Sequence, residues 1–219
     1  MRLSPFAPLP LLLFAACSTP SPTAPATDRG AGLVSFDAEA PAGAKTWERP
    51  TWRIGDRFVL QRGDAVKGEF TLVAITDDAY VLDTGGGVHL RRDRDLGNLG
   101  EWTPGGDPLH LLLPADARFH WPLWLGKRWN CEFVDRAKGG DLRLQASYHV
   151  EGLDTITVPA GTYEALRIVR RVKLVGTPDD YLTRAQIVWY APSIGSEVRQ
   201  LVSETLVELV EFTAGPPKP

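Results

Sequence analysis

Apolar and polar residues alternate with a period of two along most of the chain after about residue 47. The clearest case is residues 141–150, where every second side chain is apolar: Leu142, Leu144, Ala146, Tyr148 and Val150. Trp129, Cys131 and Phe133 alternate with polar residues in the same way. A period of two places one set of side chains in a core and the other in water, as in a half-buried strand. The pattern therefore predicts a domain built mainly of β-strands.

Short strands are predicted in the first half of this domain, at residues 57–62, 69–76, 80–84 and 88–92. Between them lie Arg62-Gly63-Asp64, Asp77-Asp78 and Gly85-Gly86-Gly87, which are compositions typical of turns. Strands this close in sequence leave no room for crossover helices, so neighbouring strands should run antiparallel. We expect an all-β, mainly antiparallel fold: a single strongly curved sheet, open or half-barrel, or a sandwich.

Three features interrupt the alternation. Residues 101–125 are rich in Gly and Pro and are predicted to form a long irregular loop. Residues 196–213 fit helical spacing as well as strand spacing, but their Val and Thr content favours two strands that meet near Ser203 and Glu204. Arg170 breaks an otherwise apolar strand face. We expect it to pair with an acidic neighbour rather than to mark a polar pocket.

The N-terminus follows a different pattern. Arg2 precedes an apolar run that extends to Ala16, and Cys17 follows at once. A basic residue before about 7–15 apolar residues is typical of an export signal, whereas a helix that spans a bilayer needs about 20. Ala15-Ala16-Cys17 resembles a bacterial lipobox, in which the cysteine is lipidated and becomes the first residue of the mature protein. The alternatives are an ordinary signal peptide cut nearby and an unprocessed start.

Lipidation of Cys17 would anchor the protein to a membrane, because each buried methylene of an acyl chain contributes about 0.8 kcal/mol. Ser18 stands where lipoproteins of the inner membrane tend to carry aspartate, so the resemblance implies the outer membrane, with the domain facing the periplasm. Four parts are predicted: a signal peptide at 1–16, a lipidated N-terminus and disordered Ala/Pro/Ser/Thr tether at 17–46, an antiparallel β domain at 47–213 and a disordered tail at 214–219. Within the tether, residues 33–36 could dock on the domain as an extra strand.

Charge and cysteine content narrow the possible functions. The formal net charge of -3 provides no basic field for nucleic acid. Cys131 lies on an apolar strand face, where a free cysteine is expected to act as a small buried hydrophobic residue. Residues 91–98 lack the oxygen spacing of a calcium loop, so a solvated mixed-charge loop is expected. No metal is predicted, because the histidines lack ligand spacing: His89, His110, His120 and His149. No cofactor is predicted either, and Gly85-Gly86-Gly87 lacks the Lys and Ser/Thr of a phosphate-binding loop.

Three motifs lie in the second half of the chain: WPLWLGKRW at 121–129, VPAGTYEALRI at 158–168 and WYAPSIG at 189–195. They resemble the PL-x-x-G-x-x-W, VPAGTF and WYAP-x-x-G motifs of a broad group of secreted and lipidated bacterial β-rich proteins, most of them uncharacterised. Tyr163 stands where that group more often has phenylalanine. The resemblance covers about residues 118–212 and implies an antiparallel sheet punctuated by these motifs. It implies no catalytic residues.

Candidate chemistry centres on four tryptophans: Trp102, Trp121, Trp124 and Trp129. They could line a hydrophobic pocket or stack on a sugar, or they could simply plug one end of a β core. Three classes of function fit the sequence. The first is a non-catalytic envelope accessory that binds a partner protein. The second is a carrier of a lipid or another hydrophobic ligand in a curved sheet, and the third is an enzyme that acts on envelope polysaccharide.

Overall fold

The computed structural model describes residues 34–35, 37, 39–63, 66–176 and 185–217. The predicted signal peptide, Cys17 and most of the predicted tether lie outside these ranges. The strands are β1 (Val34–Ser35), β2 (Arg57–Arg62), β3 (Val66–Ile75), β4 (Ala79–Asp83), β5 (His89–Asp93), β6 (Asn98–Trp102), β7 (Pro108–Asp116), β8 (Arg128–Ala137), β9 (Gly140–Val158), β10 (Gly161–Leu174), β11 (Gln186–Ala191), β12 (Ser196–Val202) and β13 (Thr205–Thr213). Within the described ranges, no helix is long and apolar enough to cross a membrane. The prediction of an all-β fold is confirmed.

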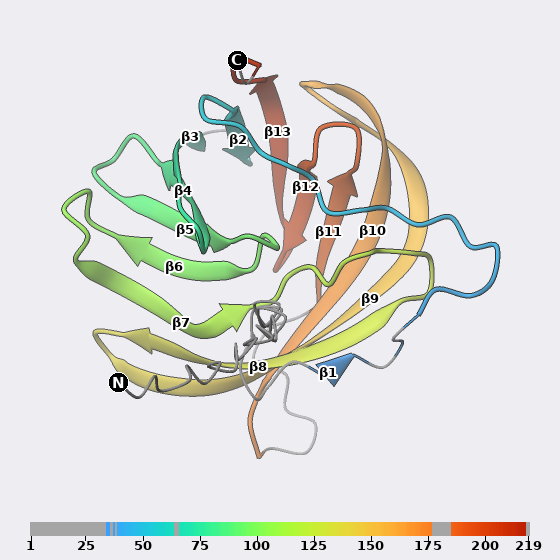
Figure 1. Cartoon of the computed structure of the whole chain (residues 1–219), viewed down its shortest axis with the longest axis horizontal. Helices are drawn as coiled ribbons and strands as arrows, with labels where there is room; N and C mark the ends of the chain where they lie inside the picture. The colour runs from blue at the N-terminus through green and yellow to red at the C-terminus, as the bar shows by residue number, and fades with distance from the viewer. Residues whose placement is uncertain (1–33, 36, 38, 64–65, 177–184, 218–219) are drawn as a thin grey trace, which may run out of the picture.

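These strands form one antiparallel sheet that closes on itself. From β8 the order runs β7-β6-β5-β4-β3-β2-β13-β12-β11-β10-β9, and β9 pairs again with β8. Figure 1 shows the strands around a common interior, with β4 to β7 on the left of the view and β9 and β10 on the right. The predicted single, strongly curved antiparallel sheet is confirmed. The β8–β9 pairing also removes the exposed edges that an open or half-barrel sheet would have.

Strand β8 pairs with three other strands. One edge pairs with β9 along its whole length. The opposite edge pairs with β1 at Trp129 and Asn130, and further along with β7 at Val134, Asp135 and Arg136. The extra strand that the sequence allowed within residues 33–36 is therefore present as β1, and it lies beside β8.

Two hairpins have two-residue turns, and the second lies where the sequence predicted that two strands meet. The chain reverses between β9 and β10 at Pro159 and Ala160. Between β12 and β13 it reverses at Ser203 and Glu204, whose φ angles are 47° and 72°. Two successive positive φ angles in a two-residue loop are the geometry of a type I′ turn, whose twist suits a hairpin. Residues 196–213 are therefore two strands and not a helix.

Two sequence predictions about loops are wrong. The irregular loop predicted at residues 101–125 contains strand β7, which pairs with both β6 and β8. Pro114 is tolerated because the pairing of β7 with β8 reaches only Leu113, so no ladder bond needs the missing N–H. In the solvated loop predicted at residues 91–98, only residues 94–97 form a turn, because β5 extends to Asp93 and β6 begins at Asn98. None of the eight residues is fully exposed.

The segment that precedes β2 packs across the closed sheet. Trp47 forms an isolated bridge with Leu123, and the two residues exchange backbone hydrogen bonds of 2.9 Å. Trp52 Nε1 donates to the carbonyl of Gly195 at 2.8 Å. In Figure 1 this segment, in blue, passes in front of β10, β11 and β12. It brings Trp52 to the interior of the sheet, where the cavity described below is found.

Both flanks of the predicted domain are packed further than the sequence suggested. Gly215 is buried, and its N–H donates to Asp56 Oδ1 at 2.8 Å. Lys45 Nζ lies 3.1 Å from Glu164 Oε1. Ordered contacts therefore begin within the predicted tether and continue into the predicted disordered tail at residues 214–219.

Candidate functional site

A cavity of about 210 Å³ lies inside the closed sheet. Its apolar lining consists of Trp52, Phe58, Leu60, Phe70, Leu82, Leu90, Leu96, Phe119 and Tyr190. Its polar lining consists of Arg92, Asn98, Arg118, Ser196, Glu197 and Gln200. The cavity thus combines an apolar body with a polar side that carries charged groups.

Strand alternation directs these side chains into the interior. Phe58 and Leu60 are two residues apart in β2, and Leu90 and Arg92 are two residues apart in β5, so each pair projects from one face of the sheet. Leu82 of β4 lies directly opposite Leu90. Arg92 therefore occupies a position at which the pattern would place an apolar residue.

Aromatic side chains pack in and beside the wall of the cavity. The ring of Trp52 lies 5.3 Å from that of Phe58 and 5.4 Å from that of Tyr80. Phe119 lies 5.1 Å from Tyr190. All five side chains are buried. Tilted ring pairs at these distances are favourable beyond their buried area, so this wall is firmly packed.

Part of the apolar lining, on β2, β3 and β5, is partly exposed to solvent. Leu60, Phe70 and Leu90 all line the cavity and are only half-buried. Phe58 and Leu82, which lie deeper, are buried. The partly exposed apolar side chains mark a path by which an apolar group can enter.

Charged residues meet on the polar side. Arg118 Nη2 lies 3.1 Å from Glu197 Oε1, and Gln200 Nε2 donates to Glu197 Oε2 at 2.5 Å. Arg92 Nη1 donates to the carbonyl of Leu96 at 3.2 Å. Burial lowers the pKa of Arg92, and the charge of Glu197 opposes this shift. Because arginine stays protonated in proteins, both guanidinium groups are cationic.

A second buried polar network lies behind this side. Arg170 Nη2 lies 2.8 Å from Asp116 Oδ2, and Arg170 Nε donates to the Tyr148 hydroxyl at 2.9 Å. That hydroxyl in turn donates to Asp116 Oδ1, and Cys131 Sγ lies 3.7 Å from the same oxygen. Burial raises the pKa of Tyr148 and of the Cys131 thiol. The predicted pairing of Arg170 with an acidic neighbour and the predicted burial of Cys131 are confirmed.

The four tryptophans singled out by the sequence do not surround this cavity, and none of them belongs to its lining. Trp129 is buried and stacks on Tyr148, with the ring centroids 5.0 Å apart. Trp124 is also buried, and Lys127 Nζ lies 4.1 Å from its ring. These two residues pack within the protein, so they offer no surface to a ligand in the cavity.

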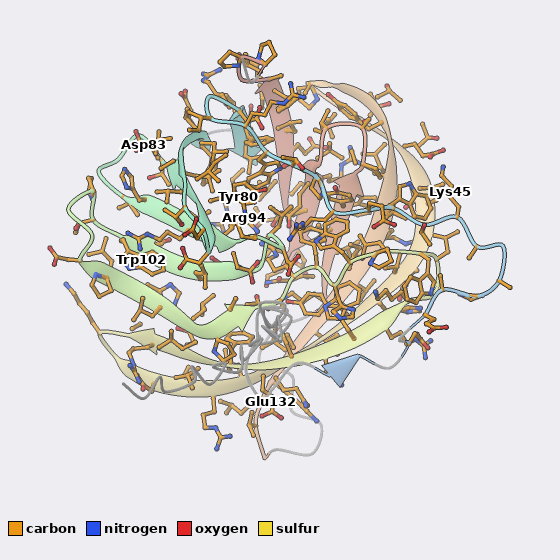
Figure 2. The ribbon with its side chains drawn as sticks, in the orientation of Figure 1. Lys45, Tyr80, Asp83, Arg94, Trp102 and Glu132 are labelled. Atoms are coloured by element: carbon orange, nitrogen blue, oxygen red, sulfur yellow. The ribbon has the colours of Figure 1, made fainter. Side chains whose placement is uncertain are left out.

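The other two tryptophans lie in separate places. Trp121 stacks on Phe119 with the ring centroids 5.4 Å apart, so it supports the cavity wall from behind. Trp102 lies under Arg91, whose guanidinium carbon is 4.5 Å from the ring. In Figure 2 Trp102 lies well to the left of Tyr80, which is near the centre of the molecule. The structure therefore does not bring the four tryptophans together into one pocket.

Sequence reasoning missed the charged residues of the cavity. Arg92 follows Leu90 at strand spacing, which is the same signal of a charge in an apolar register that singled out Arg170. Because residues 91–95 are all charged, the single charge at an apolar position of the strand could not be distinguished from its neighbours. Arg118 lies outside the strands, so no periodicity could have revealed it. No sequence pattern distinguished Glu197, because its place beside the cavity follows from the pairing of β11 with β12.

No family model matches the chain, and no curated protein matches it. The solved structures similar to it include the following three. The hypothetical lipoprotein YmcC from Escherichia coli K12 is 12% identical with a TM-score of 0.44, over 77% of this chain and 91% of that one. A protein of Parabacteroides distasonis described as a lipoprotein is 10% identical with a TM-score of 0.40, over 77% and 99%. An exported protein of Bacteroides fragilis described as having a YmcC-like fold is 11% identical with a TM-score of 0.35, over 77% and 100%. At these values the likeness carries no functional conclusion for this chain.

Proposed function

We propose that this protein is a lipid-anchored, non-catalytic protein of the cell envelope whose β domain binds a small hydrophobic ligand. The observation that carries the proposal is the interior cavity of about 210 Å³, which joins an apolar body to a polar side. Ligand sites are typically apolar hollows with a few placed polar groups, and this cavity fits that description.

The size of the cavity limits what it can hold. An engineered apolar cavity of about 150 Å³ binds benzene, whereas pockets for drug-sized ligands are about 300–1,000 Å³. At about 210 Å³ the cavity suits one ring or a short chain. A longer lipid would insert only part of its length and would leave the rest at the opening beside Leu60, Phe70 and Leu90.

The polar residues of the lining suit binding better than proton transfer. Arginine does not act as a general base, because it is not deprotonated in proteins. Glu197, the carboxyl residue in the lining, forms an ion pair with Arg118 and accepts a hydrogen bond from Gln200. A carboxylate held by two partners is poorly placed to exchange protons with a ligand.

The ligand proposal is tested by native mass spectrometry of the full chain isolated from its own envelope, followed by lipid extraction. We expect one bound small molecule with an apolar part. Leu90→Trp should fill the cavity opening and remove the molecule, whereas Leu206→Trp, at an exposed position outside the lining, should retain it. A chain that carries no ligand would favour the role of an accessory that binds a partner protein.

The anchor is a separate part of the proposal and rests on the sequence around Cys17. Cys17→Ala should move the protein from the membrane fraction to the soluble envelope fraction, because the acyl chains that hold it would be absent. Ser18→Asp is the matched change that keeps the cysteine, and it should shift the protein toward the inner membrane. Retention of the Cys17→Ala protein in the membrane fraction would contradict lipid anchoring.

A further inference from the structure

The charges of the residues that line the cavity do not sum to zero. Arg92 and Arg118 are cationic and Glu197 is anionic, so the lining carries a net charge of +1. Arg118 is paired with Glu197 at 3.1 Å. Asp116, the buried carboxylate behind the cavity, is paired with Arg170 at 2.8 Å. Among the lining residues, therefore, no second carboxylate pairs with Arg92. The charges of Asp116 and Asp93 act on Arg92 from outside the lining, but Arg92 Nη1 donates its hydrogen bond to a carbonyl and not to a carboxylate.

A tight turn holds Arg92 in this position. The carbonyl that accepts its hydrogen bond belongs to Leu96, whose φ of 69° lies in the left-handed region that a branched apolar residue rarely adopts. The turn is held in this shape by Asp93, whose Oδ1 accepts from the N–H of Asp95 at 2.9 Å and of Gly97 at 2.7 Å. Because the Leu96 carbonyl takes only one of the five N–H donors of the guanidinium, the group keeps donors for a ligand.

Arg118 is positioned by an independent segment of the chain. Its backbone N–H donates to the carbonyl of Asp116 at 2.8 Å. The carbonyl of Ala117, between them, accepts from Trp129 Nε1 at 2.8 Å. Both arginines are therefore held in place before any ligand binds, which lowers the entropy lost on binding.

We propose that the ligand of this cavity is a short apolar chain or ring that ends in a single carboxylate, and that Arg92 and Arg118 bind the carboxylate. This inference rests on the proposed function. A guanidinium matches a carboxylate with two parallel N–H···O bonds. One negative charge brings the sum of the lining to zero and gives Arg92 a directly bonded carboxylate in addition to the Leu96 carbonyl, which a neutral ligand could not do.

The rest of the lining agrees with such a ligand. The neutral residues of the polar side, Asn98, Ser196 and Gln200, can supply further donors to a carboxylate. Phe58 and Leu82 lie in the apolar body, where they would contact the chain of the ligand. The anionic end and the apolar end of one molecule thus each meet a matching part of the cavity.

The test uses the full chain with Cys17→Ala and three ligands of equal chain length: octanoate, octan-1-ol and octylamine. Binding is followed by calorimetry and by the NMR shift of the Trp52 indole N–H, which lies in the cavity wall and donates to Gly195. We expect octanoate to bind at least about tenfold more tightly than octan-1-ol, because it gains charge-assisted hydrogen bonds. Octylamine should bind most weakly.

Two variants connect this preference to the arginines. Arg92→Gln should weaken octanoate binding about tenfold or more and leave octan-1-ol binding unchanged. Arg57→Gln, whose side chain pairs with Glu69 and Glu211, is the matched control and should bind as the parent does. Arg118→Gln should also weaken octanoate binding, and circular dichroism checks its fold because it leaves Glu197 without its cation. If that variant is unfolded, the ligand series and Arg92→Gln decide the question.

The outcomes separate the two proposals. Equal binding of octanoate and octan-1-ol, tighter binding of octylamine, or no effect of Arg92→Gln would overturn the carboxylate inference and leave the hydrophobic ligand proposal standing. If neither octanoate nor octan-1-ol shifts the Trp52 resonance, both proposals are contradicted.

Discussion

Arg170 Nη2 lies 2.8 Å from Asp116 Oδ2 inside the closed sheet, where the two side chains are only 12% and 6% exposed. The residues are 54 positions apart in sequence, so the contact exists only once β7 and β10 have taken their places. Removing one partner of a buried ion pair costs about 3–5 kcal/mol, because it leaves an uncompensated buried charge. This pair therefore ties the two halves of the sheet together.

Asp116→Asn should lower the free energy of unfolding by about 3–5 kcal/mol, since it leaves the Arg170 cation without its carboxylate and replaces a charge-assisted hydrogen bond from Tyr148. Urea unfolding followed by circular dichroism measures the change. Asp141→Asn is the matched control: its partner is Arg136, and the side chains are 46% and 53% exposed. In that variant the free energy of unfolding should fall by less than about 1 kcal/mol. Equal losses in the two variants would contradict the assignment of the buried pair.

Gly100, within β6, and Gly106, in the turn between β6 and β7, provide a second matched comparison. Both have positive φ, of 114° and 97°. A Cβ at residue 100 would lie 2.1 Å from the carbonyl oxygen of His110, whereas a Cβ at residue 106 would meet nothing within 4 Å. Gly106→Ala should lower the free energy of unfolding by about 1–2 kcal/mol, because alanine is disfavoured at this positive φ.

Gly100→Ala should cost more than about 4 kcal/mol, because the clash is with backbone of the paired strand and cannot be relieved by a side-chain rotation. Thermal and urea unfolding of the two variants give the comparison. Similar stability of both would mean that β6 and β7 do not approach as closely as described.

The sequence predicted those parts of the fold that depend on local pattern. The alternation of apolar residues in 141–150 is enough to predict a strand. Ser203 and Glu204 lie between two apolar runs at a spacing that allows a hairpin, and the structure places them in its turn. In both cases neighbouring residues carry all the information that is needed, so a single sequence suffices.

The candidate site depends on contacts that no local pattern encodes. Arg92, Arg118 and Glu197 come from three distant parts of the chain, and only the closure of the sheet brings them to one cavity. Strand β7 was missed for a related reason. Its Pro114 lies beyond Leu113, where the pairing with β8 ends, and the extent of that pairing is a property of the two strands rather than of residues 101–125 alone. Long-range pairing, more than composition, thus decides where the charged side chains meet.

The thiol of Cys131 should be unreactive in the folded protein. Burial and the nearby charge of Asp116 both raise its pKa, and the reactive species is the thiolate. In the full chain with Cys17→Ala, Cys131 is the remaining cysteine, so a chromogenic disulfide reagent reports on it alone. We expect little reaction in native buffer at pH 8 and one equivalent in denaturant. Ser203→Cys in the same chain, at the exposed turn, should react in native buffer; rapid native reaction without it would contradict the burial of Cys131.

Lys127 should make stability depend on pH in the alkaline range. The side chain is fully buried, Nζ donates to the carbonyl of Pro122 at 2.6 Å, and it lies 4.1 Å from the ring of Trp124. Burial lowers the pKa of Lys127 from 10.5 to about 8, although the charge of Asp37 opposes the shift. The folded protein therefore gives up this proton at a lower pH than the unfolded chain does.

The sign of the effect follows from proton counting. Below pH 8 the lysine is protonated in both states, and the cost of burying its charge is fully present. Between about pH 8 and 10.5 the unfolded chain binds more protons than the folded protein, so the free energy of unfolding rises with pH. The total rise from this group is on the order of 3 kcal/mol. Other groups titrate in the same range, so the quantity to measure is the difference from Lys127→Met, which removes the charge.

As the pH is raised from 8 to 10.5, the free energy of unfolding of the parent should rise relative to that of Lys127→Met. Urea unfolding at each pH measures both values. Lys45→Met is the matched control, because the side chain of Lys45 is 64% exposed and its ion pair with Glu164 is at the surface. Its difference from the parent should stay within about 1 kcal/mol over the same range. If the free energies of unfolding of the parent and of Lys127→Met differ by the same amount at every pH, the prediction is contradicted. Lys127 would then keep its proton in the folded protein, because the Pro122 carbonyl and the Trp124 ring offset the cost of burial.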